Sequence, residues 1–90
     1  MIDVEQIYLE CVLPEKNKQA YYRLIAGRDL FGLKLIRTWG RIGTRERPRQ
    51  QERFVKLEEM QQRIQRILQN RLSHGYVQKR KVNVNYTVAL

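Results

Sequence analysis

The sequence predicts an α+β fold, namely a curved antiparallel β-sheet with one long α-helix packed on one face. Two observations lead to this prediction. Apolar residues alternate with polar ones in several segments before residue 43 and again near the end of the chain, which is the spacing of β-strands. Between residues 57 and 73 they recur at every third or fourth position, which is the spacing of an α-helix. One helix can cover only one face of such a sheet.

Three strands are expected before the helix. Residues 7–13, IYLECVL, place alternate apolar side chains on one face, and Pro14 ends the segment. Residues 20–26, AYYRLIA, favour a strand up to Gly27, and we expect them to pair with the first strand as an antiparallel hairpin. Residues 33–42, LKLIRTWGRI, form the third expected strand, which is bounded by turn residues.

The helix is expected over residues 57–73, with one apolar stripe buried on the sheet. The stripe consists of Leu57, Met60, Ile64, Ile67, Leu68 and Leu72. Gly75 suits the left-handed position that follows a helix. The start is ambiguous from the pattern, because residues 49–55, RQQERFV, fit either a first helical turn or a fourth strand. Residues 81–88, KVNVNYTV, alternate again and predict a half-buried edge strand.

Length and composition favour one small intracellular domain, taken here as residues 1–90. No apolar run approaches the ~20 residues that a membrane helix needs. The acidic, alternating N-terminus lacks the features of a secretory signal, so we expect a cytoplasmic protein. Cys11 is the only cysteine, which excludes an internal disulfide.

The positive charge of the chain is large and localised. The net charge is +9 at pH 7. Residues 1–15 carry four acidic and no basic side chains, whereas residues 37–53 carry six arginines and two glutamates. This distribution favours a polyanionic partner. A solvated basic surface that serves only solubility is the alternative.

Groups that could perform catalysis are scarce. His74 is the only histidine, and we expect it to complement the negative end of the helix. Cys11 lies in an expected strand and fits a small core residue better than a nucleophile. Glu58 and Glu59 are adjacent on a helix, so their side chains diverge by about 100°. The sequence therefore predicts a non-catalytic protein with no cofactor and no metal site.

The only tryptophan of the chain lies between arginines in the segment RTWGRIG. Strand alternation places Arg37, Trp39 and Arg41 on one face, opposite Ile36 and Ile42. Alternation alone leaves open which of these faces meets the helix. Because it is costly to bury two unpaired guanidiniums, we expect Trp39 to face solvent.

At WGRIG the sequence resembles the WGR domain family, which is named for this Trp-Gly-Arg and is found in poly(ADP-ribose) polymerases and in bacterial proteins, sometimes alone. Residues 21–43 resemble the family's tyrosine-bearing strand, its Leu-Phe-Gly turn and the strand that ends in WGRIG. Residues 53–76 resemble its aromatic-ended strand, its long helix and its terminal Gly-Tyr. The resemblance is to a stand-alone bacterial-type member and covers about residues 6–77, which leaves residues 78–90 as an additional edge strand or tail.

The resemblance also implies that Phe54 closes a strand and that the helix starts near Leu57. The chain departs from the family pattern at Met60, where a small helix residue is usual, at Arg71, where lysine is common, and in its arginine-rich loop TRERPR. These 90 residues do not resemble the transferase domain of the polymerases, so the resemblance does not imply their catalytic activity.

The resemblance to the larger members of the family implies a module that binds DNA breaks and relays a signal. The resemblance implies that Trp39 and Arg41 contact the nucleic-acid backbone near an end. A guanidinium suits phosphate and an indole suits a sugar or base, whereas Gly40 would allow a close approach of a ligand or mark a strand bulge.

We therefore expect a module that binds nucleic acid, DNA rather than RNA, near ends or nicks, and that would associate with the nucleoid. The expected binding residues are Trp39, Gly40, Arg41, Arg37, Arg45, Arg47 and Arg49. A protein-interaction adaptor that presents the same Trp/Arg surface to an acidic protein is the alternative, and no membrane partner is expected.

Overall fold

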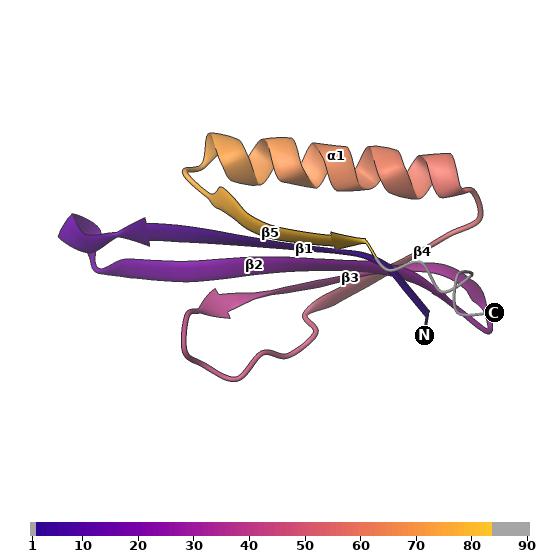
Figure 1. Ribbon diagram of the computed structural model, residues 1–90, viewed down its shortest axis with the longest axis horizontal. Helices are drawn as coiled ribbons and strands as arrows, with labels where there is room; N and C mark the ends of the chain where they lie inside the picture. The colour runs from indigo at the N-terminus through magenta and orange to yellow at the C-terminus, as the bar shows by residue number, and fades with distance from the viewer. Residues whose placement is uncertain (1, 84–90) are drawn as a thin grey trace.

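The computed structural model describes residues 2–83, which form a five-stranded antiparallel sheet and one α-helix. The elements are β1 (Ile2–Leu13), a 3₁₀ turn (Pro14–Lys16), β2 (Lys18–Asp29), β3 (Gly32–Arg41), β4 (Gln50–Phe54), α1 (Leu57–Ser73) and β5 (Val77–Asn83). The strand order is β4-β3-β2-β1-β5, and α1 lies across one face of the sheet (Figure 1). The predicted α+β fold is confirmed.

The core lies between α1 and the face of the sheet that it covers. It is built from alternate residues of the strands together with one stripe of the helix, as the two periodicities require. Its buried members are Ile7, Leu9, Tyr22, Leu24, Ala26, Leu33, Leu35, Met60, Ile64 and Ile67. Cys11 is also fully buried, in keeping with its expected place in the core.

The bounds of the helix agree with the prediction, but part of its expected buried stripe is exposed. Leu57 is 41% exposed and Leu72 is 49% exposed. At about 100° per residue, Leu72 lies about 120° around the helix from buried Met60, whereas Arg71 lies only about 20° from it. Arg71 therefore takes the inward position in the last turn and is half-buried. Leu57 is the first residue of the helix, where the chain has only just left β4.

The C-terminal end of α1 is closed by a left-handed glycine, as predicted. Gly75 has φ 91°, its N–H donates to the Leu72 carbonyl over 3.2 Å, and the Tyr76 N–H donates to the Arg71 carbonyl over 3.1 Å. This pair of bonds defines a Schellman motif. Nδ1 of His74 donates to the Asn70 carbonyl over 2.6 Å, so His74 serves the helix end as expected. The motif turns the chain sharply and returns Tyr76 to the sheet.

The strands differ from the prediction mainly at their ends. Within the ambiguous residues 49–55, the structure forms β4, and Phe54 closes it. The last strand begins at Val77 rather than at residue 81, and residues 84–88 of the expected strand lie outside the described residues. Among the described residues, no helix is long and apolar enough to cross a membrane.

Candidate nucleic-acid interface

Trp39 lies on the helix-covered face of the sheet. It pairs across the strands with Tyr22, and the two rings stack with their centroids 5.6 Å apart and an interplanar angle of 7°. The indole is half-buried and packs against the core. The prediction of a solvent-facing Trp39 is therefore wrong, because buried Leu33 and Leu35 fix the alternation of β3 the other way.

Arg37 lies on the same face of the sheet as Trp39, and its charge is paired there. Its side chain is 12% exposed, and its Nη2 lies 3.2 Å from Oε1 of Glu52. Its Nη1 donates to the Tyr22 hydroxyl over 3.3 Å, while its buried Nε has no partner. Glu52 also accepts hydrogen bonds of 3.2 Å from Arg63. One carboxylate thus serves two guanidiniums, so this group of three keeps a net positive charge.

A cleft of about 340 Å³ opens between the sheet and the end of α1, and we call it the aromatic cleft. It is lined by Tyr22, Arg37, Trp39, Arg71 and Tyr76. Tyr76 meets Tyr22 edge-on, with centroids 6.2 Å apart at 78°. The Arg71 guanidinium lies 5.2 Å from the Tyr22 ring and 5.6 Å from the Tyr76 ring. These distances are within the range of cation–π contacts.

Further cations lie around the aromatic cleft. The Lys18 ammonium is 5.6 Å from the Tyr76 ring centroid. Arg41 is exposed at the end of β3, and its Nη1 donates to the Asn17 carbonyl over 3.3 Å. A neighbouring groove of about 410 Å³ is lined by Lys16, Asn17, Lys18, Gln19, Ala20, Gly40 and Arg41. Neither the aromatic cleft nor this groove has an acidic side chain in its lining.

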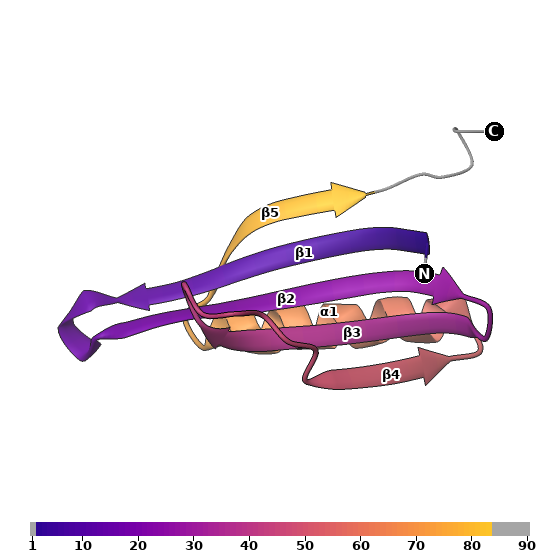
Figure 2. The same cartoon turned by 90° about the horizontal axis from the view of Figure 1, so that it is seen from below.

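The loop of residues 42–49, called here the arginine loop, runs along the face of the sheet opposite α1 (Figures 1 and 2). At its end, Nε of Arg49 donates to the Trp39 carbonyl over 2.7 Å, and the guanidinium lies 5.8 Å from the indole centroid. Arg45 and Arg47 are exposed and form no ion pair within residues 5–82. The structure thus brings Arg37 and Arg49 to Trp39, whereas Arg45 and Arg47 lie in the loop.

Gly40 points away from the aromatic cleft, towards the opposite face. A Cβ at this position would lie 3.3 Å from Cε1 of Tyr21 and 3.5 Å from its hydroxyl oxygen. The register between β2 and β3 has no irregularity, so Gly40 does not mark a bulge. Its lack of a side chain makes room for the Tyr21 ring.

One known protein family matches nearly the whole chain. The WGR domain model matches residues 5–83. The chain belongs to the WGR domain family. No curated protein and no solved structure matches the chain. A WGR domain is a small module that is not itself a catalytic domain. The matched region includes β5, so it extends beyond the resemblance over residues 6–77.

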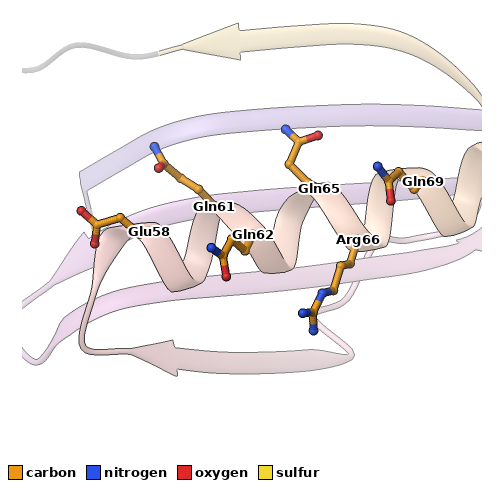
Figure 3. A pocket seen from close by; sticks show the side chains of 6 residues that line it. All are labelled: Glu58, Gln61, Gln62, Gln65, Arg66 and Gln69. Carbon is orange, nitrogen blue, oxygen red and sulfur yellow. The ribbon is translucent and has the colours of Figure 1, made fainter.

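A third hollow of this WGR domain lies on the outer face of α1 (Figure 3). It is an open depression of about 520 Å³ between side chains at helical spacing. Its lining consists of Glu58, Gln61, Gln62, Gln65, Arg66 and Gln69. The single acid and single base offset each other there, and none of the expected binding residues takes part. The aromatic cleft is therefore the better candidate for a polyanion.

Four residues at this site are not among those predicted from the sequence, namely Lys18, Tyr22, Arg71 and Tyr76. Arg71 could have been found from its angular position, since it lies on the buried side of the helix. Tyr22 alternates with Leu24 and Ala26 and so shares their face. The place of Tyr76 depends on the Schellman motif, which only the glycine at position 75 hints at.

Proposed function

We propose that this WGR domain is a non-catalytic module that binds DNA near ends or nicks. The observation that supports this most directly is the aromatic cleft, where stacked rings lie among cations and no acid lines the wall. Stacking surfaces flanked by cations are typical of sites for nucleic acid, since they meet both the apolar and the charged parts of a nucleotide.

The proposed division of tasks follows from the exposure of each side chain. Arg41 and Lys18 are exposed and would bind phosphates, for which a guanidinium offers paired donors. One face of the indole of Trp39 already stacks on Tyr22, so its remaining surface would cover a sugar or a base. Contacts of these kinds position a protein on DNA without reading its sequence.

The preference for ends follows from what an aromatic ring can reach. In continuous duplex DNA the base faces stack on each other, whereas an end or a nick exposes a terminal sugar and base face. Trp39 is held in place by Tyr22 and by the core beneath it, so it offers a fixed surface rather than a mobile one. A fixed surface loses little freedom on binding.

The second candidate is an adaptor that presents the same Trp/Arg surface to an acidic protein. It is favoured by the residue types that line the aromatic cleft, because tryptophan, tyrosine and arginine dominate the energetics of protein interfaces. Both candidates predict that the aromatic cleft contributes to binding, so the chemistry of the partner has to separate them.

A mobility-shift comparison tests the proposal. The protein would be titrated against blunt linear, nicked and closed circular duplexes and against a matched RNA duplex, with polyglutamate as an acidic competitor that is not a nucleic acid. We expect the linear and nicked DNA to bind more tightly than the closed circle and the RNA. Equal affinity for linear and closed circular DNA would refute end binding. Displacement by polyglutamate at the same charge concentration as DNA would favour the adaptor.

A further inference from the structure

The middle of the arginine loop is fastened to the sheet by an ion pair. Oε1 and Oε2 of Glu46 accept hydrogen bonds from Nε and Nη2 of Arg23 on β2, over 2.9 and 3.2 Å. The side chains are 40% and 23% exposed, respectively. The geometry is that of a two-point guanidinium–carboxylate pair, which fixes direction as well as distance.

The anchor of this pair is itself held on several sides. The Arg23 guanidinium lies 4.6 Å from the centroid of the Tyr8 ring, and the Tyr8 hydroxyl donates to Glu10 over 2.8 Å. Tyr8 stacks on Tyr21 with centroids 6.2 Å apart at 17°. Burial and the hydrogen bond to Glu10 raise the pKa of Tyr8 to about 12. The hydrogen bonds that Arg23 donates to Glu46 raise the pKa of Arg23, so the guanidinium stays charged at neutral pH.

Tyr21, on which Tyr8 stacks, contacts the Trp-Gly-Arg motif on the face of the sheet opposite α1. Tyr21 is 3% exposed and fills the space beside Gly40. Burial, followed by the charge of Glu46, raises the pKa of Tyr21. Through Arg23, the arginine loop is therefore fastened on the face of the sheet that carries Tyr8 and Tyr21.

We propose that Glu46 and Arg23 are positioning residues for nucleic-acid binding, which hold the arginine loop so that Arg45 and Arg47 form fixed contacts for phosphate. The inference rests on the proposed function and adds residues that touch no ligand. Arg45 and Arg47 are the sequence neighbours of Glu46 on either side, and both are exposed. Their cationic groups thus depend on where the chain at Glu46 is held.

The pair acts in two ways. It offsets the charge of a carboxylate that would otherwise repel phosphate from the centre of an arginine-rich segment. It also limits the conformations of the loop before DNA arrives, so that less freedom is lost on binding. Without Arg23, both the repulsion and the ordering cost would oppose the contacts of Arg45 and Arg47.

Two charge-matched variants separate positioning from charge. Glu46→Ala and Glu58→Ala each raise the net charge from +9 to +10. Glu58 is exposed on α1 and forms no ion pair within the described side chains. Glu58→Ala should bind nicked duplex as tightly as the unaltered protein or more tightly. Glu46→Ala should bind about two- to fivefold more weakly than Glu58→Ala, the factor that corresponds to an exposed ion pair.

Exchange of the partners gives the rescue. The double variant Arg23→Glu/Glu46→Arg keeps the net charge at +9 and can form the pair in reverse, so its affinity should return to within about twofold of the unaltered protein. Arg23→Glu alone places two carboxylates together and should bind the weakest of the set. A double variant no tighter than Arg23→Glu would overturn the inference.

Limited digestion with trypsin, which cuts after arginine, gives a readout without DNA. Cleavage after Arg45 should be faster in Glu46→Ala than in Glu58→Ala or in the unaltered protein, because an unfastened loop opens more often. Equal cleavage would show that the pair does not fasten the loop. If the unaltered protein binds no duplex, the proposed function fails, and the role in binding fails with it. Duplex binding with equal affinities of the two alanine variants would overturn only the role of Glu46 and Arg23.

Discussion

Replacement of Trp39 by alanine should cost both stability and end preference, in amounts that the structure allows us to work out. Full truncation of a buried tryptophan costs about 3 to 5 kcal/mol, and the half-buried indole of Trp39 should lose about half of that. The stacking on Tyr22 adds about 0.5 to 1.5 kcal/mol. We therefore expect the free energy of unfolding to fall by about 2 to 4 kcal/mol. A domain of this length has about 5 to 13 kcal/mol in total, so the variant should remain folded.

The loss in binding is smaller than that for a fully available ring. Base stacking on an aromatic side chain contributes about 1 to 3 kcal/mol. One face of the indole is occupied by Tyr22, so we take the lower part of this range, about 1 to 2 kcal/mol. That corresponds to a loss of about 5- to 30-fold in affinity for linear DNA. Affinity for closed circular DNA should change little, because Arg41 and Lys18 remain.

The assay measures chemical denaturation and the ratio of linear to circular affinity on the same samples. Ile64→Ala is the matched control. Ile64 is buried in the core, on α1 and seven residues before Arg71, so its truncation should lower the free energy of unfolding by a similar amount. It should leave the ratio unchanged. Trp39→Phe keeps a ring on Tyr22 and should therefore lie between the unaltered protein and Trp39→Ala in both measurements.

Two results would refute this reasoning. If folded Trp39→Ala keeps the linear-to-circular ratio of the unaltered protein, the indole does not contact an end. If Ile64→Ala lowers the ratio as much as Trp39→Ala does, the effect comes from general destabilisation of the fold rather than from the lost ring.

Four further outcomes are expected. Ile64→Ala should lose about 2 to 5 kcal/mol, but Leu72→Ala less than about 1 kcal/mol, in chemical denaturation; equal losses would contradict the packing of α1. The logarithm of the duplex binding constant should fall linearly with log salt, with a slope of about −0.9 per phosphate neutralised, and Arg45→Ala should reduce the magnitude of that slope by up to ~1. An affinity that does not change between ~50 and 200 mM salt would instead point to an apolar interface. Gly40→Ala should lose about 1 to 3 kcal/mol, since the new Cβ would crowd a ring 3.3 Å away, and unchanged stability would mean that the ring moves freely. The pKa of Tyr8 is raised to about 12, so its contribution to stability is complete below the unfolded value of about 10 and is lost as the pH rises towards 12; Tyr8→Phe should remove this part of the alkaline decline, as followed by denaturation.

The fold class could be predicted from the sequence because each element carries a strong local pattern. The end of α1 follows from the helical period and from Gly75, whereas its start near Leu57 is implied only by the resemblance to the WGR family; both bounds are confirmed. Within the helix the pattern is a weaker guide, because apolar residue type alone does not determine burial. Leu72 is exposed and Arg71 is half-buried, because angular position around the helix decides burial. Arg71 can take an inward position since its aliphatic stem packs inside while its charge lies at the cleft.

The candidate site was harder to predict, because its contacts join residues that are distant in sequence. The expected cost of burying Arg37 assumed that it had no partner, whereas Glu52 on the neighbouring strand supplies one. The residues of the segment RTWGRIG do not by themselves predict that Glu52 is the partner of Arg37. The stacking of Trp39 on Tyr22 depends on the register between β2 and β3, and the approach of Tyr76 depends on how the chain leaves α1. Each of these is set by the assembled fold.

The residues of the Trp-Gly-Arg motif face different sides of the sheet, so the motif couples the packing on the two faces of the sheet. Strand alternation sends Trp39 to the aromatic cleft and the side of Gly40 to the tyrosines below, while Arg41 ends the strand. A side chain at position 40 would have to push either Tyr21 or β3 itself. Movement of β3 would shift the indole against Tyr22, on the far side of the sheet. The space beside Gly40 is therefore part of what places Trp39, although the glycine faces away from the cleft.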